Sequence, residues 1–229
     1  MAQIKTKEEI SYIKKACQIT DQIFNTIISD FYFETEIELR DFIECEIQRR
    51  NLKPSFPPIV TSGPRAGNEI HPQSTNKTLQ GFVIIDFGVI YKGYMSDMTR
   101  TVFVGTPKEK DIQYYAQVFL SKTTAEHYVL PKVKVVAADL AAREALGKLN
   151  QYFIHTLGHG VGKKIHEAPK IYWKNGKIAF KENMVVTVEP GIYIPKKLGI
   201  RIEDTGVVTK KGFVALTRST QELIVLKKI

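Results

Sequence analysis

Four carboxylates lie in sequence contexts where burial would normally exclude an ionised side chain. Asp86 and Glu189 each directly follow a short, mainly apolar run that is typical of a buried strand. Asp97 stands just before another such run, and Glu203 lies in a stretch where apolar and polar residues alternate. A buried ionised carboxylate is costly unless a partner offsets its charge. We therefore expect these four acids to share a cation.

A turn brings the first two acids together. A turn near residues 91–93 lies midway between Asp86 and Asp97, which predicts that the two side chains lie roughly opposite each other on a hairpin. Like charges directly opposite each other on paired strands are destabilising. The simplest alternative pairs each acid with an arginine, and Arg100 and Arg201 could each serve one. Two arginines cannot neutralise four acids, so a metal cation explains the pattern better.

Three of the five histidines fall within one short stretch: His155, His159 and His166. Glycines flank His159 on both sides, which allows close backbone approach and leaves its imidazole accessible. His71 follows a proline-rich, extended segment. His127 lies within a predicted helix, and we interpret it as an ordinary packing or surface residue. His159 is therefore the imidazole that joins the four acids.

Four carboxylates and one imidazole are too many ligands for a single zinc ion, which favours a tetrahedral site rich in nitrogen and sulfur. They suit two divalent cations that share bridging carboxylates, and an oxygen-rich set favours manganese, iron or cobalt over zinc. Two metals about 3.5–4 Å apart can hold a hydroxide between them and polarise a carbonyl. Hydrolysis of an amide is the natural use of such a site.

Competing catalytic motifs are absent from the sequence. It has no Gly-x-Ser-x-Gly elbow, no His-Glu-x-x-His, no phosphate-binding loop and no convincing dinucleotide fingerprint. Cys17 and Cys45 lie on separate predicted helices without metal-type spacing, so both are expected to be reduced thiols in the core.

Capping motifs and periodicity predict the elements that position these residues. Thr6 with Glu9 and Thr35 with Glu38 form capping boxes, which predict helices ending near residues 28 and 50. Further helices are expected at residues 108–130 and 137–149, and strands at 82–85, 98–104, 185–188, 192–194, 200–202, 207–208 and 223–226. This order indicates one α+β domain, residues 1–229, with two related halves and helices outside a curved, mainly antiparallel sheet.

Composition and charge limit the possible partners. The 229 residues are 43% apolar and 25% charged, as in an ordinary globular protein. No apolar run approaches the roughly 20 residues of a membrane span, and the N-terminus lacks the apolar core of a signal peptide. We therefore expect a cytoplasmic protein without a membrane partner. The net charge of +9 suggests nucleic-acid binding as an alternative, but the basic residues are scattered and no stacking motif accompanies them.

These motifs, in this order, resemble the pita-bread metallopeptidases, the M24 family that includes methionine aminopeptidase, Xaa-Pro aminopeptidase and prolidase. The resemblance covers nearly the whole chain. It implies the pita-bread fold, two divalent cations and five metal ligands: Asp86, Asp97, His159, Glu189 and Glu203. Asp86 would hold one metal, and His159 and Glu189 would hold the other. The remaining two acids would bridge both metals.

The same resemblance implies roles for residues around the metals. Glu189 would also be the general base that accepts a proton from the bridging water. His71 and His166 would steady the substrate and the tetrahedral intermediate. His155 and Arg201 are assigned to substrate binding. His155 matches a histidine that lines the proline pocket, and Arg201 matches an arginine that hydrogen-bonds the metal-site carboxylates.

Several motifs resemble the proline-directed branch more closely than methionine aminopeptidase: Ser-Asp-Met-Thr-Arg-Thr at 96–101, Glu-Pro-Gly-Ile-Tyr at 189–193 and Arg-Ile-Glu-Asp at 201–204. The implied reaction is hydrolysis of the N-terminal peptide bond of a peptide, where the next residue is proline, by a monomer or homodimer. Those enzymes usually carry an additional N-terminal domain that narrows the site. None is expected here, so peptides longer than dipeptides should be accepted.

Two alternatives remain open. A methionine or broad-specificity aminopeptidase is the alternative enzyme. The alternative from another class is a non-catalytic pita-bread module that binds histones, RNA or ribosomes. Degenerate modules typically lose metal ligands, and creatine-hydrolysing relatives use the fold without metals. The complete ligand set therefore argues against a non-catalytic module and against a creatine-hydrolysing enzyme.

Overall fold

The computed structural model describes residues 4–227, in which helices pack around short strands. The helices are α1 (Lys7–Ser29), α2 (Glu36–Arg49), α3 (Glu109–Glu126) and α4 (Val135–Leu146), with the 3-10 turns η1 (Gly63–Gly67) and η2 (Gly147–Tyr152). Residues 1–3, part of the N-terminal stretch that argued against a signal peptide, lie outside the described residues. Among the described residues, no helix is both long and apolar enough to cross a membrane.

Both capping boxes form as predicted. Thr6 and Glu9 exchange side-chain to backbone hydrogen bonds at the start of α1, and Thr35 and Glu38 do the same at the start of α2. The later helices are shorter than predicted. α3 ends at Glu126, and α4 ends at Leu146. Gly147 follows α4 with a φ of 53°, a conformation that ends a helix.

The cysteine prediction holds for one residue and is wrong for the other. Cys17 is buried in α1, whereas Cys45 is exposed on α2. Ile43 and Ile47 are buried on α2, and Cys45 lies two residues from each of them. Because residues two apart on a helix point in different directions, Cys45 faces away from the core.

Within residues 4–227 the strands form four small sheets. The first half contributes β1 (Lys53–Pro54), β2 (Ile59–Ser62), β3 (Gly81–Phe87), β4 (Val89–Tyr91), β5 (Tyr94–Met95) and β6 (Met98–Val104). The second half contributes β7 (Gly158–Gly160), β8 (Glu167–Ile171), β9 (Val185–Val188), β10 (Gly191–Ile194), β11 (Leu198–Arg201), β12 (Asp204–Thr209), β13 (Gly212–Ala215) and β14 (Val225–Leu226). The larger sheets have the orders β14-β6-β3-β2 and β13-β12-β9-β7-β8. Among these pairings only β14 with β6 is parallel, which confirms a mainly antiparallel α+β fold.

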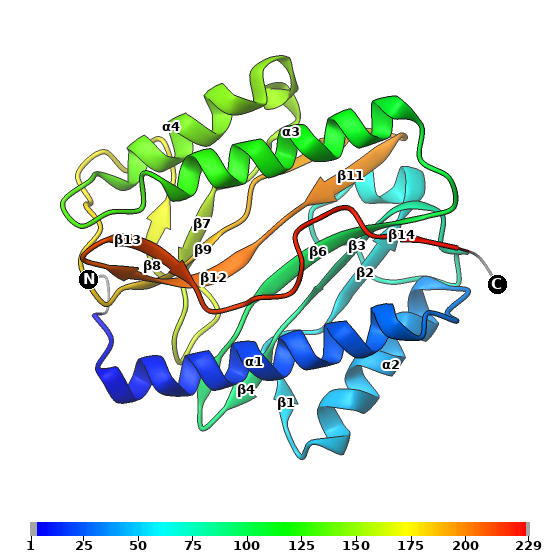
Figure 1. Cartoon of the computed structure of the whole chain (residues 1–229), viewed down its shortest axis with the longest axis horizontal. Helices are drawn as coiled ribbons and strands as arrows, with labels where there is room; N and C mark the ends of the chain where they lie inside the picture. The colour runs from blue at the N-terminus through cyan, green and yellow to red at the C-terminus, as the bar shows by residue number, and fades with distance from the viewer. Residues whose placement is uncertain (1–3, 228–229) are drawn as a thin grey trace.

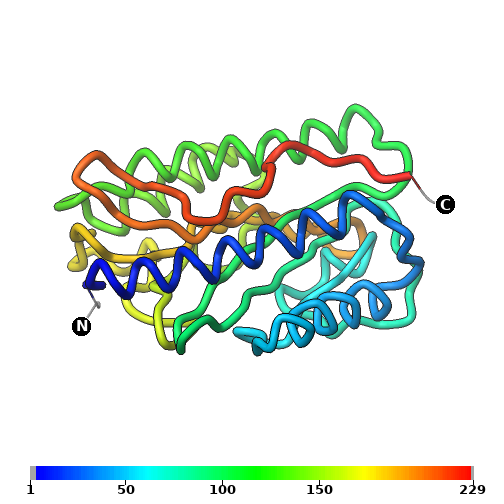
Figure 2. Tube along the Cα trace, turned by 60° about the horizontal axis from the view of Figure 1, so that its bottom comes forward, coloured from blue at the N-terminus to red at the C-terminus, as the bar shows by residue number. Residues whose placement is uncertain are grey.

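Each pair of helices covers mainly the strands of its own half, and α3 also packs against Phe82 of β3 and Phe103 of β6. α1 and α2 lie on one side of the strands, and α3 and α4 lie on the other (Figure 1). One apolar cluster joins α1 and α2 to β2, β3 and β6, and another joins α3 and α4 to β9–β12. The C-terminal segment runs between α1 and α3 in both views (Figures 1 and 2). Asp21 of α1 accepts hydrogen bonds from the backbone N–H groups of Arg218 and Ser219 in this segment.

The hairpin that carries the first two acids changes sheet along its length. β3 pairs with β6, but the turn end of the same hairpin, β4 with β5, belongs to a separate sheet with β1. The turn residues Lys92 and Gly93 both have positive φ, which sets the register. Asp86 therefore pairs with Thr99, and Asp97 is two residues away from the position directly opposite Asp86. The two acids are diagonal neighbours, which corrects the expected opposition.

At this change of sheet the two strands approach closely. A Cβ added at Gly88 would lie 1.8 Å from the carbonyl oxygen of Ser96. Ser96 also uses its hydroxyl to accept a hydrogen bond from the backbone N–H of Val89 at 2.9 Å. The backbone on both sides of Asp97 is therefore held against the strand that carries Asp86.

We expect Gly88→Ala to lower the free energy of unfolding by about 1–3 kcal/mol or more, because the added methyl group forces the backbone to shift. Gly176→Ala is the matched control, since a Cβ at Gly176 has nothing within 4 Å. Urea denaturation followed by circular dichroism measures both changes. Equal stability of the two variants would contradict the close approach at Gly88.

Candidate functional site

A cavity of about 580 Å³ is lined by all four predicted acids. Asp86 lies in β3 and Asp97 directly precedes β6. Glu189 directly follows β9 and Glu203 directly precedes β12, and these two strands are paired up to the adjoining residues. Both halves of the fold thus direct a pair of carboxylates into one cavity from a pair of antiparallel strands.

Three of the four acids are buried, and Glu189 is half-buried beside them. Asp86 and Asp97 are each 5% exposed, and Glu203 is 2% exposed. Burial raises the pKa of Asp97 and Glu203 well above the ordinary value, and repulsion from the neighbouring carboxylates raises it further. The carboxylate oxygens Oδ1 of Asp86 and Oε1 of Glu203 are buried without a hydrogen-bond partner. Such oxygens, surrounded by other carboxylates, fit the coordination of a divalent cation.

The protein's own positive charges offset little of this negative charge. Arg201 Nη2 donates to Asp86 Oδ2 at 2.5 Å. Arg100, the second arginine considered from the sequence, pairs instead with Asp204, which also contacts Lys122 Nζ at 2.6 Å. Within residues 4–227, no lysine or other arginine forms an ion pair with the four acids. The arginine alternative therefore accounts for one acid only.

His159 completes the cluster. Its Nε2 lies 3.1 Å from Glu189 Oε1 and 3.6 Å from Asp97 Oδ2. Ligand atoms of Asp97, Glu203 and His159 all lie within 4.8 Å of one another. Burial would raise the pKa of Glu189, but the hydrogen bond and charge of His159 outweigh it and bring this pKa to about 2. Glu189 is consequently ionised at neutral pH.

The glycines beside His159 are required by packing. A Cβ at Gly158 would lie 2.1 Å from the carbonyl oxygen of Thr187, and one at Gly160 would lie 2.5 Å from that of Ala168. β7 fits between β8 and β9 because it lacks these side chains. Thr187 Oγ1 accepts from the backbone N–H of His159 and donates to Glu189 Oε1 at 3.0 Å. Sequence reasoning missed Thr187, although it is a polar residue within an apolar strand.

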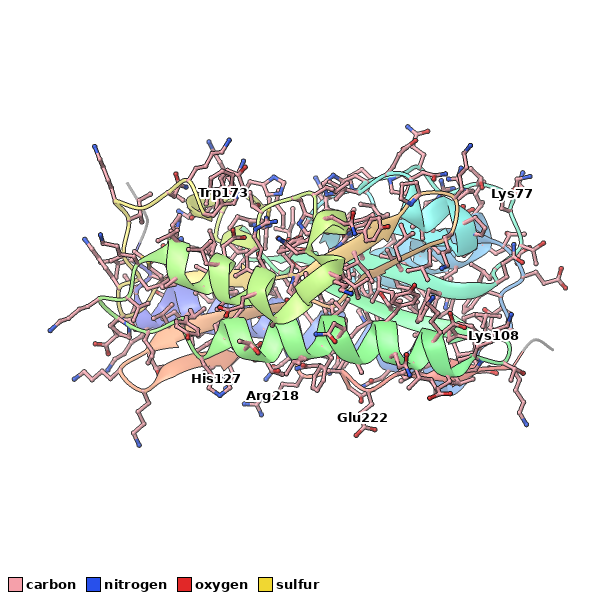
Figure 3. The ribbon with its side chains drawn as sticks, turned by 90° about the horizontal axis from the view of Figure 1, so that it is seen from above. Lys77, Lys108, His127, Trp173, Arg218 and Glu222 are labelled. Carbon is pink, nitrogen blue, oxygen red and sulfur yellow. The ribbon has the colours of Figure 1, made fainter. Side chains whose placement is uncertain are left out.

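The other predicted histidines lie around the same space. His71 and His166 line the cavity with exposed side chains, and the His166 ring packs edge-on against His159 with centroids 4.4 Å apart. An adjoining cavity of about 460 Å³ is lined by these three histidines and by His155. His127 directly follows α3 and is exposed, with its Nδ1 2.7 Å from the carbonyl oxygen of Thr123. In Figure 3 His127 lies on the long edge opposite Trp173.

Hydrogen bonds fix His155 in the adjoining cavity. The Tyr193 hydroxyl accepts from Arg201 Nη1 at 2.6 Å and lies 3.1 Å from His155 Nε2. His155 Nδ1 lies 2.8 Å from the carbonyl oxygen of Thr156. The network therefore assigns the ring proton to Nδ1, with Tyr193 donating to Nε2. Burial lowers the pKa of His155 to about 4, so the ring is neutral.

This chain belongs to metallopeptidase family M24, whose family model matches residues 11–210. It is similar to the Xaa-Pro dipeptidase of Pyrococcus furiosus, with 40% identity over 96% of this chain and 65% of that protein. Among solved structures it resembles the Xaa-Pro dipeptidase of Bacillus anthracis, with a TM-score of 0.92 and 38% identity over 97% of this chain and 64% of the other. The X-Pro aminopeptidase of Thermotoga maritima also has a TM-score of 0.92, with 32% identity over the same shares.

These comparisons confirm the pita-bread fold and the resemblance to the prolidase branch of the family. The chain spans slightly less than two thirds of the length of its curated relatives, covering 62–65% of each of eight of them. The activity and the role of each site residue are therefore proposals.

We expect Arg201→Met to destabilise the protein by about 3–5 kcal/mol, because it leaves a buried carboxylate without its partner. The matched control is Arg40→Met, which removes a pair of the same 2.5 Å length between Arg40 and Asp41 at the surface. That loss should cost about 0–1 kcal/mol. Urea denaturation of metal-stripped protein measures both, and similar costs would contradict the burial argument.

Proposed function

We propose that this chain is a metal-dependent peptidase that hydrolyses the N-terminal peptide bond of peptides whose second residue is proline. The observation that carries the proposal is the cavity with three buried acids and the half-buried Glu189, one arginine and two carboxylate oxygens without partners. Membership of family M24 supports it. The names of the relatives support the choice of an Xaa-Pro bond.

Five residues would hold two divalent cations. Asp86 would bind one cation, His159 and Glu189 would bind the other, and Asp97 and Glu203 would bridge the two. With four carboxylates to one imidazole, this donor set favours manganese, cobalt or iron over zinc. When bound, such a pair supplies polarisation of the scissile carbonyl and a lowered pKa for the attacking water.

Residues of the chain would move the protons and hold the substrate. Glu189 is the proposed general base, and its Oε1 already accepts from Thr187 and contacts His159, which leaves Oε2 to receive a proton from the attacking water. His71 and His166 face the cavity with exposed rings and would donate hydrogen bonds to the substrate carbonyl and to the negative charge that develops on it.

The adjoining cavity would receive the proline ring. Its lining includes Ile70, Ala168 and the neutral ring of His155. A proline nitrogen carries no hydrogen and its ring fixes φ, so a wall that packs against the ring gains contacts that an unbranched residue cannot supply. The Tyr193 hydroxyl would keep the His155 ring in place as part of that wall.

Metal binding has a direct test. Chelator-stripped protein titrated with Mn²⁺ should bind about two ions per chain and gain stability, about 2.7 kcal/mol when the free metal reaches 100 times its Kd. Asp97→Asn and Glu203→Gln should each lower the affinity for both ions, because each acid would bind two cations. Glu182→Gln, at an exposed acid, is the control. Calorimetry and elemental analysis measure binding. If both variants bound two ions with unchanged affinity, the bridging assignment would be refuted.

Proline selectivity has a kinetic test. We expect kcat/KM to be higher for Xaa-Pro peptides than for the same peptides with alanine at the second position. His155→Ala should reduce this preference more than it slows cleavage of the alanine peptides, because it removes part of the proposed ring pocket. Met-Ala peptides provide the comparison with a methionine aminopeptidase. Faster cleavage of Met-Ala peptides would favour that alternative and leave His155 a packing residue.

A further inference from the structure

A fully buried carboxylate outside the acidic cavity has no task in the proposed reaction. Glu36, the first residue of α2, is 0% exposed. Its Oε1 accepts from the backbone N–H of Ser62 at 2.8 Å and from the Ser62 hydroxyl at 3.3 Å. Its Oε2 accepts from the backbone N–H of Thr75 at 3.0 Å and from the Thr75 hydroxyl at 2.8 Å. One side chain thus joins two segments that lie 13 residues apart in the sequence.

The helix itself does not require these contacts. The N-terminus of α2 is already capped by Thr35 and Glu38, whose side chains satisfy the local backbone N–H groups. All four hydrogen bonds of Glu36 are made outside α2. Burial of a carboxyl group is costly unless its oxygens have partners, so its four donors stabilise one particular arrangement of Ser62 and Thr75. Arg65 Nε, in the same segment, lies 3.5 Å from Glu36 Oε2.

Ser62 and Thr75 are the two ends of the segment that carries His71. Within this segment Arg65 Nη2 donates to the carbonyl oxygen of Gln73 at 2.8 Å. Near the tip of the loop, Arg201 Nη1 donates to the carbonyl oxygen of Ile70, directly before His71, at 3.2 Å. Among the described residues the His71 ring forms no hydrogen bond, so its position depends strongly on the backbone that carries it.

We infer that Glu36 is a positioning residue that fixes the His71 loop at its base, in concert with Arg201 near its tip. The inference rests on the proposed function, because it requires His71 to act on the substrate. A shift of about 1 Å in a reacting group can cost on the order of 10²-fold in rate. Releasing the base of the loop therefore lowers kcat while the metal ligands, which lie on other segments, remain in place.

Glu36→Gln is the main variant, because it keeps the size of the side chain but replaces one acceptor oxygen with an NH₂ group that cannot accept from Thr75 or Ser62. Hydrogen exchange of the metal-loaded protein should become faster across residues 62–75 and stay unchanged in β9 and β12. We expect kcat to fall by roughly 10–10²-fold with KM and metal content nearly constant. Glu46→Gln, on the same helix but paired with Arg49 and Arg50, is the matched control and should change neither readout.

A double-mutant cycle separates positioning from general stability. In a His71→Ala background, Glu36→Gln should lower kcat no further, because the group that it positions is gone. Thr75→Val, which removes one donor to Glu36 and leaves the Glu36 side chain unchanged, should give a weaker form of the same effects if Glu36→Gln does not fold. The same additional loss in both backgrounds, or unchanged exchange across residues 62–75, would overturn the inference.

The proposed function can fail separately. Full activity of His71→Ala would remove the catalytic role proposed for His71 and would overturn this inference with it. Loss of activity in His71→Ala, combined with normal kcat and normal exchange in Glu36→Gln, would overturn the role of Glu36 alone.

Discussion

The cost of gathering four carboxylates in one buried cavity determines much of this structure. Each acid lies within or directly beside a paired strand, where the backbone cannot move away from its neighbours. Arg201 offsets one of the four charges, and two oxygens of the cluster, Asp86 Oδ1 and Glu203 Oε1, are buried without a hydrogen-bond partner. A flexible surface would relieve this repulsion by letting the acids separate. Strand pairing and the apolar clusters packed on both sides prevent that separation, and the remaining repulsion makes the cavity attractive to cations.

Both halves support this cavity in similar ways. In the first half, Glu36 on α2 holds the two ends of the His71 loop. In the second half, Asp139 on α4 accepts from the backbone N–H of Trp173 at 3.0 Å and from Arg143 Nε at 2.9 Å, and Arg143 Nη2 in turn donates to the carbonyl oxygen of His155 at 2.8 Å. In each half an acid on the second helix thus holds a loop that carries a cavity histidine in place: Glu36 for His71, and Asp139, through Arg143, for His155. The expectation of two related halves therefore extends to the polar contacts beneath the site.

The sequence predicted what local chemistry specifies and missed what depends on distant partners. The capping boxes at Thr6 and Thr35 are local, and both helices begin where they predict. The acids were recognisable because charge beside an apolar run is anomalous wherever the strand lies. β7 was missed because its residues, Gly-His-Gly, show no strand periodicity, and only the neighbouring Thr187 and Ala168 backbones explain the glycines. Glu36 could not be recognised, since its partners Ser62 and Thr75 are defined by tertiary structure alone.

Arg201 gives the two cavities a common support. Its guanidinium donates to Asp86, to Thr99 Oγ1 and to the Tyr193 hydroxyl, which lies against His155. A lysine could not span these acceptors, because a guanidinium presents five donors in a fixed plane. The position of Asp86 and the shape of the cavity around His155 are consequently set by one rigid group. The spacing between the acidic cluster and the proposed proline pocket follows from the geometry of this guanidinium, so a substrate would meet both at a fixed separation.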